Sequence, residues 1–188
     1  MLFSRISLFF VLSLILLPGN LQAAEINKVF FDDTYRQSGV TLPLRGTGLL
    51  KFLLFIDAYV AAFYLQEEVR AQEALGDVPK RLEIQYFHAI KAKDFAVSTS
   101  KLIADNQNPE TVARLEPKIE AINNLYVDVR SGDRYALTYT PGKGTELSLN
   151  GAARGTIPGS EFAAAIFSIW LGKKPIDKNL KKQLLGSP

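Results

Sequence analysis

The 188-residue chain contains no cysteine and a single histidine, His88. Without cysteine it forms no disulfide, and it offers neither a thiolate nucleophile nor a sulfur ligand for a metal. One histidine excludes a histidine-rich metal site and any mechanism that needs two imidazoles. His88 shares an expected strand face with Tyr86, where a structural role is commoner than a catalytic one. We therefore expect neither a bound metal nor another cofactor.

Several familiar functional patterns are also missing. No glycine-flanked nucleophilic serine occurs. Asp32 and Asp33 are adjacent, so on a strand they face opposite sides and make a poor carboxylate pair for glycoside hydrolysis. The run from Gly142 to Gly144 lies between two expected strands, which indicates a hairpin loop and not a phosphate cradle. The net charge of +3 is small and forms no basic stripe with aromatic residues, so we expect no nucleic-acid partner.

The first residues have the three-part pattern of an export signal. One positive charge at Arg5 precedes an unbroken apolar run over 6–17, a Pro-Gly-Asn break follows, and the segment ends in a small residue at Ala23. We predict a secretory signal over 1–23, one domain over 24–188, and a periplasmic location. The alternative is an uncleaved membrane anchor, but the apolar run is shorter than the ~20 residues that a span needs.

Residues 49–65 are almost wholly apolar and could be mistaken for a membrane helix. Lys51 and Asp57 within the segment, and its aromatic and β-branched content, argue against that interpretation. Near-continuous apolar strands are typical of burial on both faces. The segment therefore predicts two central strands joined near residues 55–57.

The remaining elements follow from periodicity and turn residues. Strands are predicted over 26–31, 81–90, 134–140, 146–149 and 152–157, with a two-residue hairpin turn at Asn150-Gly151. Helices are predicted over 67–75, after a cap at Asp94, from Asn108-Pro109 with a kink or restart at Pro117, over the apolar 161–171, and from 175–177 to Gly186. This order indicates an α+β fold with one antiparallel sheet and helices packed on one face.

Polar residues in the apolar strands are the candidates for a binding site. Lys51, Asp57 and Tyr59 interrupt the segment 49–65, and Arg45 lies just before it. A buried lysine or aspartate is unfavourable unless it is paired. Lys51 and Asp57 could pair across the hairpin. Alternatively, Lys51 and Tyr59 point into a cleft, where a cation and a phenol would bind a carboxylate or an enolate.

The C-terminal segment offers two further features. The apolar helix that carries Trp170 is predicted to pack in the core and could also form one wall of an apolar cleft. The last helix has a basic face, made by Lys173, Lys174, Lys178, Lys181 and Lys182. Such a face is usually solvated, and weak contact with anionic lipid head groups is the alternative.

With these elements in place, the chain resembles the chalcone isomerase-like family, specifically its bacterial exported branch. The resemblance is carried by GTGLLKFLLFIDAYVAAFYL (46–65), RLEIQYFHAIKAKDF (81–95) and the later pieces GDRYALTYTPG, LNG and FSIWLGKKP. It implies an open-faced β-sandwich, in which a large antiparallel sheet and a helical layer enclose a ligand cleft. That architecture agrees with the fold class expected from the pattern of elements.

The resemblance also implies where a ligand binds. The plant isomerase uses an arginine and a threonine whose positions fall on Thr47 and Tyr59, and its later tyrosine has no counterpart here. Fatty-acid-binding relatives hold the carboxylate with an arginine and a tyrosine, for which Lys51 and Tyr59 are the best equivalents. We therefore predict a non-catalytic binding protein for a small amphipathic ligand such as a fatty acid, with Lys51, Tyr59, Arg45 and Thr47 as candidate binding residues. The alternative is an isomerase or lyase that acts on a phenolic or enone substrate.

Overall fold

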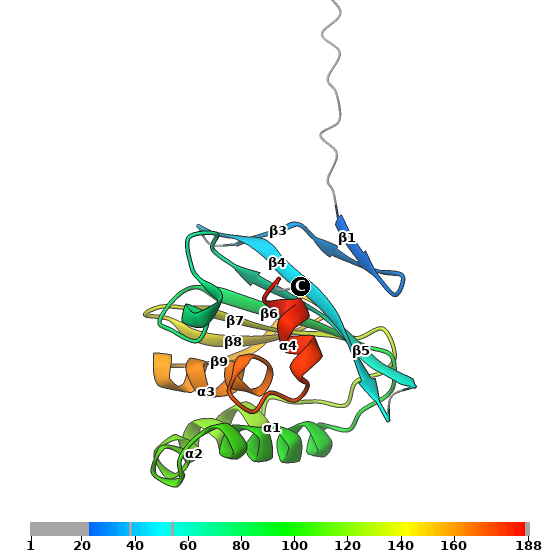
Figure 1. The fold of residues 1–188 in the computed structure, drawn as a ribbon. Coiled ribbons are helices and arrows are strands. Elements are labelled where there is room, and N and C mark those ends of the chain that lie inside the picture. Colours follow the sequence, from blue (N-terminus) through cyan, green and yellow to red (C-terminus); the bar gives the residue numbers. More distant parts are fainter. Residues whose placement is uncertain (1–22, 38, 54, 187–188) are drawn as a thin grey trace, which may run out of the picture.

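The computed structural model describes residues 23–37, 39–53 and 55–186. The predicted export signal, residues 1–23, therefore lies outside the described residues except for Ala23. One antiparallel sheet of seven strands runs in sequence order from β3 to β9 (Figure 1). The strands are β3 Thr34–Gln37, β4 Val40–Phe52, β5 Ile56–Leu65, β6 Lys80–Tyr86, β7 Arg134–Thr140, β8 Gly144–Leu149 and β9 Ala152–Ile157. A separate two-stranded sheet pairs β1 Ala23–Ile26 with β2 Val29–Asp32.

The helices fall in two places along the chain. They are α1 Ala92–Asn106 and α2 Pro109–Asn123, between β6 and β7, and α3 Ser160–Leu171 and α4 Lys178–Leu184, after β9. The curled sheet and the helical layer against it confirm the predicted α+β class (Figure 1). The predicted helix over 67–75 is reduced to one 3₁₀ turn, Ala71–Glu73.

The central hairpin of β4 and β5 confirms the two strands expected from the apolar segment. Alternate residues of β5 face opposite ways, with Tyr59, Ala61 and Phe63 in the main core. Val60 and Tyr64 join a second cluster with Val29 and Phe31 of β2. The outer face of β5 is thus covered by the β1–β2 hairpin, which explains why the strand is apolar on both sides.

That small hairpin corrects one expectation. A single strand over 26–31 is wrong, because Asn27 and Lys28 have positive φ angles of 51° and 64° and turn the chain back on itself. The two-residue turn with left-handed backbone is the same type that Asn150-Gly151 makes between β8 and β9, with φ angles of 50° and 82°. Asn27-Lys28 lacks the glycine that makes such a turn recognisable in a sequence.

Helix starts give a mixed outcome. Asn108 caps α2 as predicted, since its Oδ1 accepts a hydrogen bond from the Thr111 backbone N–H at 2.8 Å. Asp94 is not a cap but lies in the first turn of α1, and the cap is supplied by Asp128, whose Oδ1 accepts from the Ala92 N–H at 2.9 Å. α2 continues through Pro117 without a restart.

The end of β6 also differs from the prediction. The strand stops at Tyr86, and His88 lies beyond it with an exposed side chain. His88 therefore shares no strand face with Tyr86. It takes part neither in the core nor in the cavity described below.

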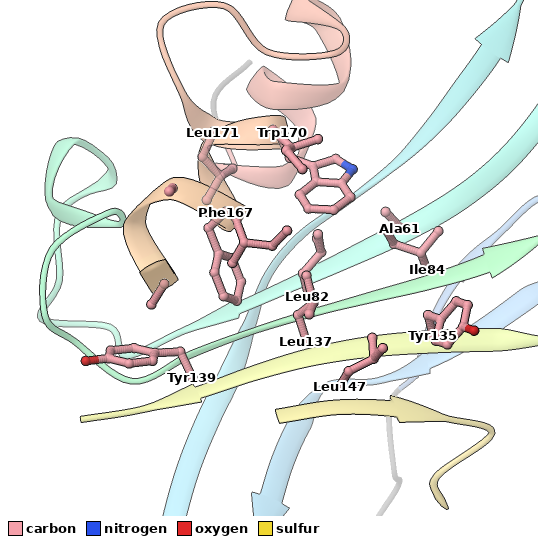
Figure 2. Packing of buried hydrophobic residues seen from close by; sticks show 14 of the residues in the cluster. Ala61, Leu82, Ile84, Tyr135, Leu137, Tyr139, Leu147, Phe167, Trp170 and Leu171 are labelled. Carbon is pink, nitrogen blue, oxygen red and sulfur yellow. The ribbon is translucent and has the colours of Figure 1, made fainter. Parts of the chain in front are cut away.

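The main core lies between the concave face of the sheet and α3. Phe167, Trp170 and Leu171 of α3 lie over Leu82 of β6 and Leu137 of β7 (Figure 2). All five side chains are buried. The apolar helix is therefore a core helix, as its sequence predicts.

One charged side chain is enclosed in this core. Lys80 is fully buried, and its Nζ donates a hydrogen bond to the Gly76 carbonyl at 2.6 Å and lies 4.7 Å from the centre of the Tyr139 ring. Burial lowers the pKa of Lys80 to about 8, and the nearby Asp77 carboxylate opposes that shift. The fold therefore holds a lysine whose charged form is less favourable than in the unfolded chain.

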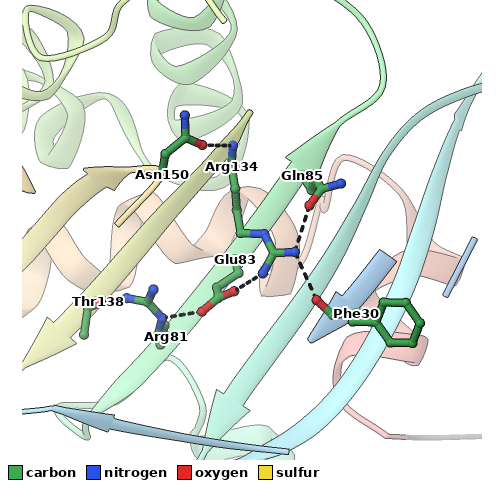
Figure 3. Close-up of polar contacts among 7 residues, drawn as sticks. All are labelled: Phe30, Arg81, Glu83, Gln85, Arg134, Thr138 and Asn150. Carbon is green, nitrogen blue, oxygen red and sulfur yellow. Dashed lines mark hydrogen bonds and ion pairs between the residues drawn. The ribbon is translucent and has the colours of Figure 1, made fainter. Parts of the chain in front are cut away.

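The outer face of the sheet carries a buried ionic network (Figure 3). Glu83 accepts from Arg81 Nε at 2.8 Å and from Arg134 Nη1 at 3.1 Å. Arg134 also donates to Gln85 Oε1 at 2.8 Å and to the Phe30 carbonyl at 3.0 Å, which ties β2 to the sheet. Glu83 is 9% exposed, so its charge depends on these two guanidinium groups.

Candidate functional site

A cavity of about 340 Å³ lies between the sheet and the helical layer. Its wall is formed by Leu50, Phe52, Ala58, Tyr59, Leu82, Ile84, Tyr86, Ile90, Asp94, Phe95, Ser98, Thr99, Leu102, Tyr126, Tyr135, Leu137, Leu147, Ile169, Trp170 and Ile176. These residues come from β4 to β8, from α1 and α3, and from the segments beside them. A largely apolar cavity of this size is within the range of small-molecule sites, about 300–1,000 Å³.

Aromatic rings pack edge to face along one side of the cavity. The Tyr86 ring lies 5.8 Å from that of Tyr59, 5.2 Å from Phe95 and 6.2 Å from Tyr135, between ring centres. Phe95 and Tyr126 stack at 5.4 Å. Edge-to-face and offset pairs of this kind are favourable, so they hold the wall in place.

The tyrosine hydroxyls on this wall differ in how their hydrogen bonds are satisfied. Trp170 Nε1 donates to the Tyr59 hydroxyl at 3.0 Å, which leaves the Tyr59 proton available. The Tyr135 hydroxyl both accepts from and donates to the backbone of Val127. Tyr126 shares a hydrogen bond with Thr99 at 3.1 Å.

Tyr86 is the exception. Its side chain is 5% exposed, and its hydroxyl makes no hydrogen bond to any other residue that the structure describes. Polar groups inside a fold are nearly always paired with protein groups or with water. The side-chain oxygens that are fully enclosed and unpartnered among the described residues are Asn123 Oδ1 and Thr145 Oγ1, so the Tyr86 hydroxyl is open to the cavity. A hydroxyl that faces an apolar cavity without a protein partner is suited to receive a polar atom of a ligand.

Burial keeps these phenols protonated. It raises the pKa of Tyr59 and of Tyr86 well above the usual value near 10, and it raises that of Tyr126 to about 12, where the Thr99 hydrogen bond opposes the shift. At neutral pH the hydroxyls are therefore neutral donors and acceptors. They supply no negative charge to a reaction.

These shifts give the protein an unusual dependence of stability on pH. Between pH 8 and 10 the unfolded chain binds more protons than the folded one, because the Lys80 pKa is about 8 when folded and 10.5 when unfolded. The free energy of unfolding should therefore rise, by on the order of 2 kcal/mol between pH 7 and 10. Above pH 10 the tyrosines act in the opposite direction, because the unfolded chain loses phenol protons first, and stability falls.

Urea unfolding curves at successive pH values measure this profile, and Lys80→Met is the control. The variant should lose the rise between pH 8 and 10 and keep the fall above pH 10. A profile that is flat between pH 8 and 10 in the unmodified protein would contradict the burial of the Lys80 ammonium.

The cavity wall lacks positive charge. Among the described lining residues there is no lysine, arginine or histidine, and Asp94, exposed in the first turn of α1, is the one carboxylate. An isolated carboxylate inside an apolar cavity is strongly unfavourable without a cation. The wall therefore fits a ligand with a neutral polar group better than a ligand with an ionised carboxylate.

The four predicted binding residues are not brought together. Tyr59 lines the cavity, whereas Lys51, Arg45 and Thr47 are not among its lining residues. Lys51 lies opposite Asp57 in the hairpin, with 3.6 Å between Nζ and Oδ1. The side chains are 52% and 36% exposed, so the expectation that this pair is buried is wrong. A ligand-binding role for these residues stays a prediction.

Arg45 and Thr47 belong to a region of β4 that α4 covers. Arg45 Nε donates to the Leu185 carbonyl at 3.4 Å. A Cβ added to Gly46 would lie 2.1 Å from the Gln183 carbonyl oxygen, so only glycine allows the helix to approach this closely. The apolar side of the basic helix therefore packs on β4. Lys178 and Lys182 are exposed, whereas Lys181 is half-buried and its Nζ donates to the Gly172 carbonyl at 2.7 Å.

Replacing Lys51 tests what the surface pair contributes. Because the pair is exposed, Lys51→Met should change the free energy of unfolding by less than about 1 kcal/mol, far from the 3–5 kcal/mol of a buried pair. Thermal melts of Lys51→Met and Asp57→Asn measure this directly. A titration of the same variants with dodecanoic acid tests the binding role, since loss of a charge-assisted bond weakens affinity by roughly tenfold or more.

Sequence reasoning missed most of this site. The alternation of β6 correctly places Leu82, Ile84 and Tyr86 on one face. That pattern was the available signal for Tyr86, but Tyr126, Thr99 and Phe95 reach the same wall from other elements. In the described part of the chain no helix is long and apolar enough to span a bilayer. The same residues contain no cluster of three or more metal-ligating side chains.

Comparison with known proteins places the fold. The sequence profile of the chalcone isomerase-like family matches residues 23–186. No curated protein matches the chain. The crystal structure of a fatty-acid binding protein from Arabidopsis thaliana is similar, with a TM-score of 0.69 over 88% of this chain and 96% of that protein, at 16% identity. At this identity the likeness shows a shared fold.

Proposed function

The chain belongs to the chalcone isomerase-like family, and on that premise we propose that it binds a small amphipathic molecule, such as a fatty acid, without transforming it. The observation that carries the proposal is the Tyr86 hydroxyl, which lies on a buried residue, faces an apolar cavity and has no hydrogen-bond partner among the described residues. A ligand with an apolar chain and one polar atom would fill the cavity and pair that hydroxyl. The fold of the plant fatty-acid binding protein supports this interpretation.

The chemistry of the wall narrows the ligand. Tyr86 and Tyr59 each offer a hydroxyl proton, and no basic side chain lies beside them. Two neutral donors suit a neutral acceptor, such as a carbonyl, a hydroxyl or a protonated acid. A fatty acid would therefore bind with its head group protonated or with the carboxylate at the open end of the cavity, in water.

We also propose that the protein is exported to the periplasm and belongs to a bacterial exported branch of the family. The three-part pattern of residues 1–23 supports export. A fusion of these residues to a reporter that is active only outside the cytoplasm tests it. An inactive reporter, with the fusion retained in the cytoplasm, would refute export.

An isomerase or lyase acting on a phenolic or enone substrate is compatible with the family, but no contact among the described residues favours it. That hypothesis placed Lys51 beside Tyr59 in one cleft, whereas Lys51 is paired with Asp57 at the surface. The neutral phenols supply no base. Catalysis stays a prediction that turnover of a chalcone, followed by absorbance, would test.

Tyr86→Phe provides the sharpest test of the binding proposal. Loss of a hydrogen bond to the ligand should weaken binding of dodecanol by about 0.5–1.5 kcal/mol, or roughly threefold to tenfold. Stability of the free protein should stay nearly unchanged, because the variant removes no hydrogen bond to a described residue. Trp170, the one tryptophan, lies in the cavity wall and reports binding by its fluorescence.

The matched control is Tyr135→Phe, which removes a hydroxyl that is already paired with the Val127 backbone. This change should lower stability and leave affinity nearly unaltered. If Tyr86→Phe destabilises the free protein and binds dodecanol as the unmodified protein does, its hydroxyl has a structural partner and the proposal fails.

A further inference from the structure

Most of the large exposed apolar side chains that the structure describes lie at the β4–β5 hairpin or beside the cavity. The large hydrophobic residues that the described part of the chain exposes are Phe30, Phe52, Leu53, Phe55, Ile56, Val97 and Ile176. Four of them form the tip of the β4–β5 hairpin. Phe52 and Ile176 also line the cavity, and Val97 is next to the lining residue Ser98.

The hairpin tip extends beyond the N-terminal end of α1 (Figure 1). Phe52, Leu53, Phe55 and Ile56 are 59%, 60%, 77% and 37% exposed. With roughly 150–200 Å² for each side chain, the tip exposes on the order of 400 Å² of apolar surface. Patches of that size on a monomer are often functional.

The backbone at Leu53 strengthens this observation. Its φ angle is 50°, in the left-handed region where glycine or asparagine is the usual residue. A leucine there is unfavourable, and its side chain is exposed, so the fold gains no core packing in return. The position keeps a large apolar side chain in contact with solvent although a smaller residue would make the better turn.

We propose that the tip, defined as Phe52, Leu53, Phe55 and Ile56, inserts into the surface of a lipid bilayer. A second copy of the chain is the poorer occupant, because a specific dimer buries about 800 Å² on each partner, twice what the tip offers. A bilayer needs no matching surface and takes up phenylalanine and leucine at its interface. The tip adjoins the cavity, because Phe52 belongs to both.

The charges beside the tip indicate which kind of contact this is. Lys51 is paired with Asp57, and Lys91, just before α1, is paired with Asp128 at 2.8 Å. Both of these lysines are therefore paired with a carboxylate. The contact is therefore apolar, and it should depend only weakly on salt and on anionic lipid.

Cosedimentation with vesicles tests the proposal. The chain from Ala23 onward, which contains the whole described fold, is mixed with vesicles of phosphatidylethanolamine and phosphatidylglycerol. The double variant Leu53→Asn with Phe55→Ser should lower the partition coefficient by at least about tenfold. Asparagine suits the backbone at position 53, so the variant should fold, and a thermal melt verifies this.

Phe30→Ser is the matched control. Phe30 is 59% exposed, like Phe52, but belongs to β2 on the outer face of the sheet (Figure 3). This variant should partition within about twofold of the unmodified chain. The proposal is overturned if the unmodified chain stays in solution, if the tip variant partitions normally, or if partition is lost with Lys178→Glu and Lys182→Glu instead. Loss of a dimer in the tip variant, seen by sedimentation velocity, would also overturn it.

The bilayer proposal for the tip is tested separately from the proposal that the cavity binds a ligand. Vesicle binding is measured without any added fatty acid or alcohol, and dodecanol binding is measured without vesicles. A failure of one experiment therefore leaves the other proposal standing.

Discussion

Glu83→Gln is expected to lower the free energy of unfolding by about 3–5 kcal/mol, the largest stability effect that the structure predicts for one substitution. Glu83 is 9% exposed and accepts from both Arg81 and Arg134. Glutamine keeps the shape of the side chain but removes the charge and adds an amide donor. Arg81, which is buried, and Arg134, whose side chain is 29% exposed, would then lack their shared counter-ion.

The surface pair of Arg114 with Glu161 provides the control. These side chains are 50% and 49% exposed, so Glu161→Gln should reduce stability by no more than about 1 kcal/mol. Urea unfolding at neutral pH compares the two variants. Equal effects in both would show that the Glu83 network is open to water and contributes like a surface pair.

Ser98→Trp is expected to abolish ligand binding, with a loss of affinity of about a hundredfold or more. Ser98 lies on α1, has an exposed side chain, and forms part of the cavity wall. An indole placed there would occupy much of a cavity of about 340 Å³ and displace the ligand. Because the substitution is on an exposed helical position, stability should change by less than about 1 kcal/mol.

Val97→Trp is the matched control on the neighbouring position of the same helix. Val97 is 69% exposed and is not part of the cavity wall. The Val97→Trp variant should bind dodecanol with the same affinity as the unmodified protein. Normal binding by Ser98→Trp would place the ligand outside this cavity.

Local patterns predicted much of the fold. The turn at Asn150-Gly151, the cap at Asn108 and the alternation of β6 depend on residues close in sequence. The turn at Asn27-Lys28 was missed because it contains no glycine. The α1 cap was missed because Asp128 lies 36 residues from the Ala92 N–H that it accepts from.

The candidate site was harder to predict because it also depends on contacts between residues far apart in the sequence. The sequence identified Lys51 and Tyr59 as polar residues in apolar strands. In the hairpin, however, Lys51 lies opposite Asp57 and pairs with it at the surface. The cavity wall combines residues of five strands and two helices, and its decisive feature is that the Tyr86 hydroxyl has no hydrogen-bond partner among the described residues. Such an absence follows from how distant elements pack, which periodicity does not encode.

The central claim is that one apolar molecule with a neutral polar group occupies the cavity between the sheet and the helices. Native mass spectrometry of the purified protein tests it most directly, before and after extraction with organic solvent. The account predicts one extractable adduct on each unmodified chain and on Val97→Trp, and none on Ser98→Trp. An adduct on all three proteins would contradict it, as would an unmodified chain that carries no adduct and binds neither dodecanol nor dodecanoic acid.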